Sequence, residues 1–148
     1  MRVGVASPLG PLAVEIDNGA ISTLRWQAHP QGGDDRFGVA AQLGEYFAGT
    51  RKAFDLPLDA QGTPFQRAVC DAMLAIPYGE TRTYGEIAAA LGASAQAVGN
   101  ACGGNPIPII IPCHRVLGAT SLGGFSGAGG VETKVWLLRH EGAAGLLL

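Results

Sequence analysis

The sequence IIIPCHRV, at residues 109–116, places a cysteine and a histidine directly after three consecutive isoleucines that lie between two prolines. An apolar run of this kind is typical of a buried strand or another core segment. We therefore expect the chain to carry Cys113 into a semi-enclosed site and not onto open surface. A cysteine that only packs there is inert, since free cysteine is among the most buried residue types. A neighbouring imidazole, cation or helix N-terminus would make it reactive by favouring the thiolate.

Two further polar residues would suit a reactive thiol. Asn105 precedes the apolar run, and Glu141 follows the last expected helix directly after His140. With Cys113 and His114 they supply a carboxamide, a carboxylate, a thiol and an imidazole, the groups that a relayed thiol nucleophile needs. Sequence alone leaves open whether these groups meet. If they do, the thiol is expected to have a pKa below that of an isolated cysteine.

Composition limits the classes of protein to consider. A chain of 148 residues, 47% hydrophobic and 15% charged, can form one globular domain or two small lobes. Its formal charge of −2, with only ten Lys and Arg, argues against a protein that binds nucleic acid mainly by neutralising phosphates. The three cysteines, Cys70, Cys102 and Cys113, lack CxxC spacing, so neither a disulfide framework nor a cysteine-rich zinc site is indicated.

No targeting or membrane segment is recognisable. The first residues lack the apolar stretch of a signal peptide, and no run in the chain approaches the roughly 20 apolar residues of a membrane span. We therefore expect a cytoplasmic protein without a membrane partner.

The N-terminal part predicts a small α/β lobe. Apolar residues from 12 to 24 are interrupted by Asp-Asn-Gly at 17–19, which is typical of a β-hairpin turn. A helix is expected over 36–48 and one more strand over 54–59. Residues 60–62 are interpreted as a boundary, which divides the chain into lobes at 1–60 and 61–148.

The C-terminal lobe is expected to be mainly helical. Thr63 and Thr83 each begin a capping box, and Ser94 can cap a further short helix that runs to about Cys102. Gly92 suits the C-terminal end of the helix that begins after Thr83. These two short helices indicate a winged-helix-like helix-turn-helix, with an ordinary helical hairpin as the alternative. The overall expectation is an α/β (α+β) fold.

The second helix of that pair and a later glycine-rich stretch remain ambiguous. Residues 95–103 contain no Lys or Arg, so this helix cannot read the major groove by bidentate arginine contacts. Its small side chains suit either close approach to a minor groove or tight helix packing. Residues 118–130 contain six glycines and can wrap a ligand or form a surface loop. They lack the phosphate-binding GxxxxGK[ST] pattern. A closing helix with Val131, Val135 and Leu138 on one face is expected to follow.

Several motifs together resemble the O6-alkylguanine-DNA alkyltransferases, also called methylated-DNA–protein-cysteine methyltransferases. The resemblance covers about residues 61–142. The matching motifs are Gly-Asn-Pro at 104–106, PCHRV at 112–116, IPYGETRTYGEIA at 76–88, QAVG at 96–99 and WLL…HEG within 136–142.

This resemblance implies roles for five catalytic residues. Cys113 would take the alkyl group from O6 of guanine, or from O4 of thymine. His114 would accept the thiol proton through a water, and Glu141 would stabilise the imidazolium. Asn105 would hold the segment that bears Cys113, and Tyr84 would protonate or polarise the departing guanine. Because a thioether has no good leaving group, each molecule would react once.

The resemblance also implies the substrate and its binding residues. The partner would be double-stranded DNA containing O6-alkylguanine, bound through the minor groove by a monomer that needs no cofactor and no metal, with the base rotated out of the duplex. The residues expected to contact the base are Ser126, through its amide, Phe125 and Val116. Those expected to contact DNA are Gln96, Ala97, Gly99, Asn100 and Thr83.

The chain departs from the family pattern at several positions. Gln96 stands where the pattern has an arginine that fills the stack left by the flipped base, and the turn after Gly92 is two residues shorter. Phe125 replaces the tyrosine of some members, and Cys70 replaces an aromatic residue. Two other functions stay open: a thiol hydrolase with multiple turnovers, and a noncovalent binder of alkylated bases, against which Cys113 itself argues.

Overall fold

The computed structural model of the chain describes residues 1–28, 35 and 37–143. It divides into two units, Met1–Gln61 and Gly62–Leu148. Residue 36, where the first expected helix begins, and the leucine-rich tail at 144–148 lie outside the described residues.

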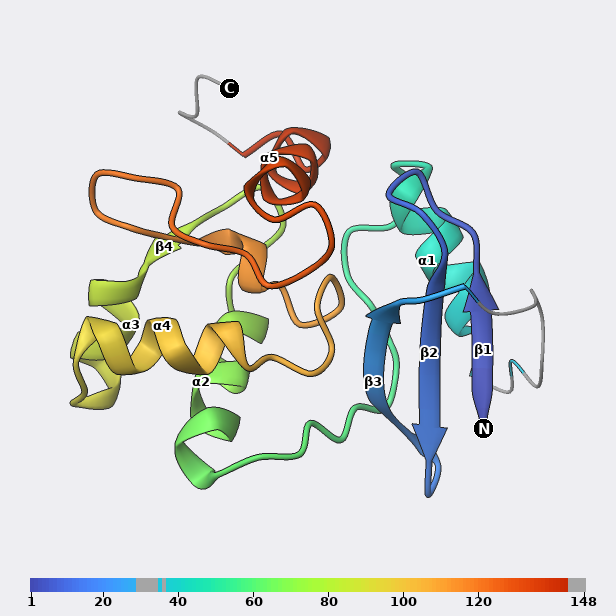
Figure 1. Ribbon diagram of the computed structural model, residues 1–148, viewed down its shortest axis with the longest axis horizontal. Helices are drawn as coiled ribbons and strands as arrows, with labels where there is room; N and C mark the ends of the chain where they lie inside the picture. The colour runs from blue at the N-terminus through green and yellow to red at the C-terminus, as the bar shows by residue number, and fades with distance from the viewer. Residues whose placement is uncertain (29–34, 36, 144–148) are drawn as a thin grey trace. The chain divides into compact units, whose positions relative to one another are not determined.

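The first unit contains a three-stranded antiparallel sheet in the order β1-β2-β3 (Figure 1). Its strands are β1 (Arg2–Val5), β2 (Leu12–Asp17) and β3 (Ala20–Trp26). The expected hairpin is confirmed, because Asn18 and Gly19 take the left-handed φ values of 51° and 80° that a tight two-residue turn requires. β1 was not predicted, because its four residues are too few to show a clear alternation.

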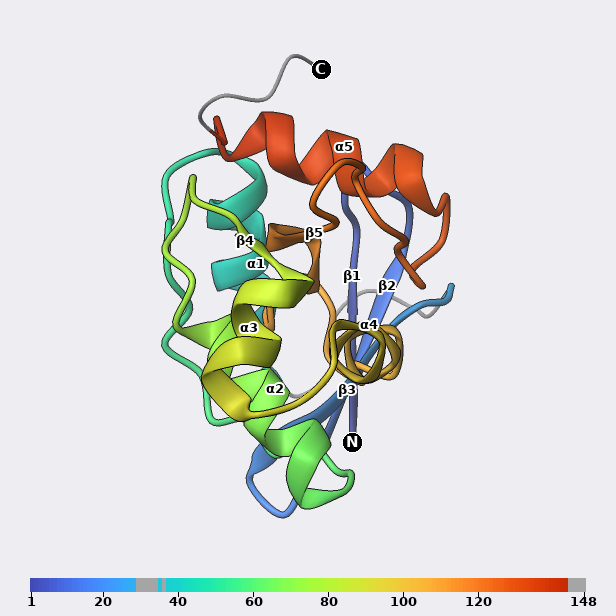
Figure 2. The ribbon, with the colours of Figure 1, turned by 90° about the vertical axis from the view of Figure 1, so that its left-hand side faces the viewer.

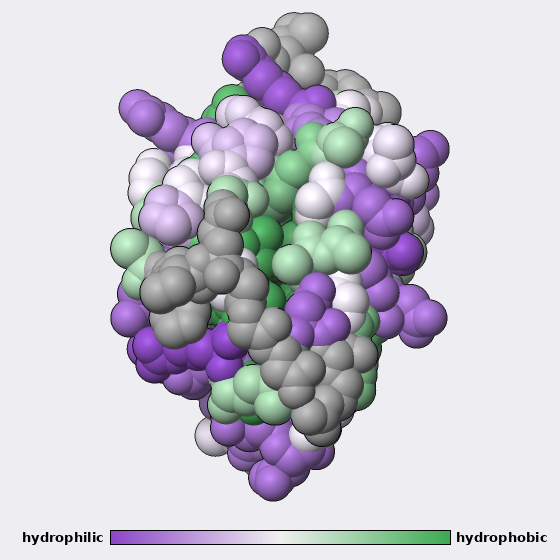
Figure 3. Space-filling model, turned by 90° about the vertical axis from the view of Figure 1, so that its right-hand side faces the viewer, coloured by the Kyte–Doolittle hydropathy of each residue, from purple (hydrophilic) through white to green (hydrophobic). Residues whose placement is uncertain are grey.

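One helix, α1 (Val39–Phe47), completes this unit and lies inside the range expected for it. Asp35 accepts hydrogen bonds from the backbone amides of Val39 and Ala40 and so satisfies free donors of the first turn. The core of the unit comes from both element types and includes Leu12, Val14, Ile21, Leu43 and Tyr46. The face drawn in Figure 3 shows hydrophobic surface at its centre, bordered by hydrophilic side chains.

The strand expected over 54–59 is wrong. Only Leu58 forms a bridge there, with Ile21, through the bonds from Ile21 N to Pro57 O and from Asp59 N to Ile21 O, both 2.8 Å. Pro57 has no amide hydrogen and cannot extend a ladder.

The second unit begins with the helices that the capping boxes predicted. They are α2 (Pro64–Leu74), α3 (Tyr84–Leu91) and α4 (Ala95–Gly103). Thr63 and Thr83 each accept a bond from the third helical residue, whose own side chain bonds back to the cap. Such a cap contributes about 1 kcal/mol to helix stability. Gly92 ends α3 with φ 66°, and α3 and α4 lie side by side as a helix-turn-helix (Figure 2).

The isoleucine run is a core segment but not a strand. Residues 107–111 are all buried, yet they form a tight turn in which Ile111 N donates to Ile107 O over 2.9 Å and Ile109 has φ 73°. The prolines at 106, 108 and 112 lack amide hydrogens, which prevents a regular ladder. The run leads into a single-turn 3-10 helix, η1 (Cys113–Arg115).

Two short strands join the beginning of α3 to the residues after η1. β4 (Arg82–Thr83) pairs in parallel with β5 (Val116–Leu117), a contact that the sequence did not predict. The expected closing helix is present as α5 (Val131–His140), and its first residue, Val131, is 44% exposed. Its buried residues are Thr133, Lys134, Leu137 and Leu138.

No helix in the described part of the chain is long and apolar enough to cross a membrane.

Candidate active site

Asn105 fixes the turn that presents Cys113. Its Nδ2 donates to Ile111 O over 2.9 Å, and its Oδ1 accepts from Ile107 N over 3.0 Å. The carboxamide therefore ties both ends of the buried turn together, two residues before Cys113. Cys113 then opens η1 and is only 5% exposed.

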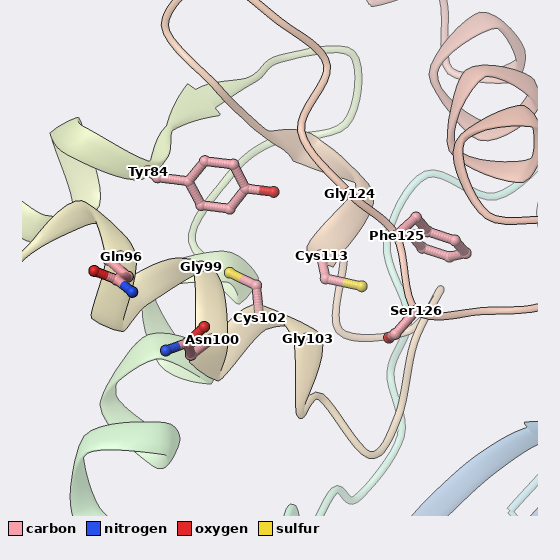
Figure 4. A pocket seen from close by; sticks show the side chains of 10 residues that line it. All are labelled: Tyr84, Gln96, Gly99, Asn100, Cys102, Gly103, Cys113, Gly124, Phe125 and Ser126. Atoms are coloured by element: carbon pink, nitrogen blue, oxygen red, sulfur yellow. The ribbon is translucent and has the colours of Figure 1, made fainter.

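Cys113 lines a cavity of about 530 Å³, a size within the range of small-molecule sites. The wall combines residues of α3 and α4, η1 and the glycine-rich loop at 118–130 (Figure 4). In the close-up, the Tyr84 ring projects from α3 toward the region between Cys102 and Gly124. The lining residues are Tyr84, Gln96, Gly99, Asn100, Cys102, Gly103, Cys113, Gly124, Phe125 and Ser126.

Behind Cys113 lies a buried ionic network of three side chains. His114 Nε2 is 2.7 Å from Glu141 Oε2, at the C-terminal cap of α5. Arg115 donates from Nε to Glu141 Oε1 over 2.7 Å and from Nη2 to Oε2 over 3.0 Å, and its Nη1 donates to Ile76 O over 2.7 Å. Glu141 thus receives the histidine and a bidentate arginine together.

Burial decides the protonation state of His114, and the network decides which ring nitrogen carries the hydrogen. Burial raises the pKa of Glu141, but the hydrogen bonds from His114 and Arg115 outweigh it and lower that pKa to about 2. The pKa of His114 is lowered, mainly by burial, so its imidazole is neutral near pH 7. Because the ionised carboxylate only accepts, Nε2 carries the hydrogen and Nδ1 is the basic nitrogen. Nδ1 has no hydrogen-bond partner among the described residues.

The expected low pKa of the Cys113 thiol is wrong for the free site. Burial raises the pKa of Cys113, although a hydrogen bond with Asn105 and the charge of Lys134 act in the opposite direction. The thiol therefore stays protonated until a base removes its proton. Cys102 lines the same wall, but its thiol is harder to deprotonate, because burial raises its pKa to about 12.

Lys134, a residue to which the sequence assigned no role, links the cavity wall to α5. Its fully buried Nζ donates to Val116 O over 2.6 Å and Gly124 O over 3.0 Å and lies 3.5 Å from the Tyr84 hydroxyl oxygen. Burial lowers the pKa of Lys134 to about 8, which leaves it mostly protonated at neutral pH. A signal was present in the sequence, since Lys134 precedes Leu137 by three residues and Leu138 by four and so shares their helical face.

The glycine-rich loop is held against Tyr84, which argues for an ordered cavity wall. Besides the Lys134 contacts, Thr133 Oγ1 donates to Ala128 O over 2.5 Å. Gly123 has φ 71°, and a Cβ placed there would lie 2.6 Å from the Tyr84 hydroxyl oxygen. Burial raises the pKa of Tyr84, so its hydroxyl keeps its proton and can donate it as a hydrogen bond.

Gly123→Ala is expected to slow the site's reaction by roughly tenfold, because a 1 Å displacement of a positioning group can cost still more. The new methyl group must push the Tyr84 ring or the loop away. Gly49→Ala is the matched control, since Gly49 also has positive φ, 82°, but nothing lies within 4 Å of its Cβ position. Reaction rates and melting temperatures should be measured for both. Equal rates in the two variants would show that the Gly123–Tyr84 contact does not matter.

The structure brings most of the expected site residues together. Gln96, Gly99, Asn100, Phe125 and Ser126 all line the cavity with Cys113 and Tyr84. His114, Asn105 and Glu141 are buried and do not line it.

The other expected contacts lie elsewhere. Val116 is fully buried in β5, Ala97 is in α4 and Thr83 caps α3, and none of the three is part of the described wall. Arg115 belonged to the recognised motif, but sequence reasoning gave it no role. In the described ranges, no group of three or more His, Cys, Asp and Glu could hold a metal ion.

The chemistry that this arrangement supports is displacement by sulfur. A soft nucleophile faces a cavity, a neutral imidazole adjoins it in the chain, and a phenol can donate a hydrogen bond to a departing oxygen or nitrogen.

Comparisons with known proteins agree with this interpretation. Residues 64–143 match the family described as 6-O-methylguanine DNA methyltransferase, DNA binding domain. The chain is 44% identical to the methylated-DNA–protein-cysteine methyltransferase of Mycobacterium tuberculosis, over 93% of this chain and 89% of that protein. It is 42% identical to the protein of the same name from Salmonella typhimurium, with 93% of each covered. The crystal structure of Mycobacterium tuberculosis OGT in complex with DNA is similar with a TM-score of 0.87 and 44% identity, over 96% of this chain and 92% of that one.

Proposed function

The chain belongs to the methylated-DNA–protein-cysteine methyltransferases, which repair DNA by transferring an alkyl group to one of their own cysteines, and we propose that Cys113 is the acceptor here. The observation that carries the proposal is the position of Cys113 in the cavity wall, with the His114–Glu141 pair buried behind it. Cys70 does not line the cavity, and Cys102 lines it with a pKa near 12.

The proton of the thiol passes to Nδ1 of His114, directly or through a water. Nδ1 is the nitrogen free to accept, because Nε2 donates to Glu141. The ionised Glu141 then stabilises the imidazolium. Since the thiol pKa is raised by burial, the thiolate forms only as this transfer occurs, which limits side reactions of the free protein.

The group transfer forms one bond and breaks one. The Cys113 sulfur attacks the alkyl carbon, and the bond between that carbon and O6 breaks with its electron pair moving into the purine. Tyr84 donates a hydrogen bond to the purine as its negative charge develops. The guanine gains a proton equivalent to the one that the thiol lost, so the products are neutral guanine and a thioether. The thioether has no good leaving group, so each molecule reacts once.

The second unit is the proposed DNA-binding and alkyl-acceptor domain, and 1–60 is an N-terminal α/β lobe. The helix-turn-helix of α3 and α4 offers small residues, among them Ala97 and Gly99, that permit close approach to the minor groove of duplex DNA. Asn100 and Thr83 can add polar contacts. Ser126 and Phe125 supply the base-binding side of the cavity, and Val116 is connected to it through Lys134, which donates to the carbonyl oxygens of both Val116 and Gly124. The protein acts as a cytoplasmic monomer without cofactor or metal.

Intact-protein mass after incubation with DNA containing O6-methylguanine tests this function. The mass should increase by one methyl group per molecule and then stop, and peptide mapping should place the methyl on Cys113. Release of product well beyond one equivalent would instead indicate a multiple-turnover hydrolase. Tight binding of the DNA with unchanged mass would indicate a noncovalent binder.

Gln96→Arg is expected to speed repair of duplex DNA by roughly tenfold, with little effect on transfer from the free base. Gln96 is exposed at the second residue of α4 and lines the cavity, so an arginine there could occupy a vacated stack and contact a phosphate. The salt dependence of binding should steepen by about one phosphate contact.

Gln61→Arg is the matched control for this variant. It introduces the same charge at an exposed position outside the cavity. Binding and single-turnover rates should be compared for both variants on duplex DNA and on free O6-methylguanine. If the two variants behave alike, net charge and not the position of Gln96 explains the effect.

A further inference from the structure

Among the residues that the structure describes, none with a charged side chain lines the cavity that contains Cys113. All ten lining residues belong to types without a formal charge at pH 7. Apart from Cys113, five of them are small: three glycines, one serine and one cysteine. Such a wall can bind an uncharged base by shape and hydrogen bonds. It offers no cation to the phosphates on either side of that base.

The second unit also has few cations free to bind phosphate. Gly62–Leu148 carries five basic and five acidic residues, so its formal charge is zero. Two of the five cations make hydrogen bonds inside the unit. Arg115 donates to Glu141 and to Ile76 O, and Lys134 donates to the carbonyl oxygens of Val116 and Gly124. A third cation, Arg82, forms an ion pair in which its Nη1 lies 3.5 Å from Glu80 Oε1. The other two cations of the unit, Arg67 and Arg139, are exposed.

The first unit does not compensate for this. The formal charge of the whole chain is −2 and that of Gly62–Leu148 is zero, so Met1–Gln61 carries the net negative charge. Phosphate contacts supply most of the affinity with which proteins hold DNA without regard to sequence. Binding energy from this source is therefore small here.

Rotating a paired base out of a duplex costs a few kcal/mol, and the cost is least for a mismatched or single-stranded base. A protein can offset this free energy by contacting phosphates of the distorted duplex and by inserting a side chain into the space that the base leaves. α4 places two amide side chains in the cavity wall, Gln96 and Asn100, both of them uncharged, and the helix contains no Lys or Arg.

We propose that this protein acts on alkylated guanines that are already unpaired, in single strands, bubbles or weakly paired mismatches, and that it does not itself open stable base pairs. This inference rests on the proposed function and names the substrate class of the same site. The DNA supplies the open base, and the neutral cavity captures it. The protein should therefore repair an alkylated guanine faster when the base pair that contains it is less stable.

Single-turnover kinetics on a matched set of DNAs tests the inference. One sequence with one O6-methylguanine is used as a single strand, within an unpaired bubble, opposite thymine and opposite cytosine in a stable duplex. Protein concentration is raised until each rate reaches its plateau, which removes differences in binding. The plateau rate constants for the single strand and the bubble should exceed that for the stable duplex by about tenfold or more, because that ratio reflects the cost of opening.

Equal plateau rates for the bubble and the stable duplex would overturn the inference while leaving the proposed function intact. Absence of methyl transfer from every DNA would instead refute the proposed function. The Gln96→Arg variant should reduce the bubble-to-duplex ratio, and Gln61→Arg should not. A ratio near one in the unmodified protein, insensitive to Gln96→Arg, would show that another residue opens the duplex.

Discussion

Cys113→Ser is expected to transfer no alkyl group from DNA while keeping its fold. Serine is nearly isosteric with cysteine, but its alcohol is a much weaker acid and a poorer nucleophile at neutral pH. His114 cannot generate a comparable anion from it. Intact-protein mass after exposure to O6-methylguanine DNA should remain unchanged, and the melting temperature should stay within a few degrees of the unmodified protein.

Cys102→Ser is the control for this experiment. Cys102 lines the same cavity, but its thiol stays protonated because burial raises its pKa to about 12. This variant should still receive one methyl group, on Cys113. A methyl group found on Cys102 or Cys70 in the Cys113→Ser protein would contradict the assignment of the acceptor.

Glu141→Gln is expected to slow transfer by roughly a hundredfold, since the imidazolium formed in the reaction loses its counter-charge. It should also lower the free energy of unfolding by about 3 kcal/mol, because Arg115 is left as a buried charge without its partner. Rates come from single-turnover transfer, and stability from urea unfolding.

The double variant Glu141→Gln with Arg115→Met separates the two effects. Removing the unpaired guanidinium should restore part of the stability, whereas transfer should remain slow because His114 still lacks its carboxylate. Recovery of the rate together with the stability would mean that Glu141 acts only through folding.

The pH dependence of stability provides an independent check on Glu141. Its pKa falls from an ordinary 4.5 to about 2 on folding, so its stabilising contribution is complete above about pH 4.5 and is lost as the pH falls toward 2. This shift corresponds to about 3 kcal/mol. Folding also lowers the pKa of His114, so the unfolded chain binds a proton at this residue more readily than the folded chain does. This difference likewise reduces the stability of the fold as the pH falls below about 6.5. In Glu141→Gln the loss between pH 4.5 and 2 should largely disappear.

The sequence by itself determined the features that depend on neighbouring residues. The capping boxes at Thr63 and Thr83 and the turn at Asn18 and Gly19 join residues three positions apart, so local spacing specifies them. The family resemblance, which the comparisons confirm, also rests on contiguous motifs and led to Cys113 as the proposed acceptor.

Only the tertiary structure decided the electrostatics of the site. Glu141 and Arg115 are 26 positions apart, and Lys134 and Tyr84 are 50 apart, so spacing along the chain gives no information about either contact. The raised pKa of the Cys113 thiol, opposite to the expected direction, follows from its burial in the folded unit. Desolvation depends on everything packed around a group, and for that reason the sequence indicated which groups could react but not their protonation states.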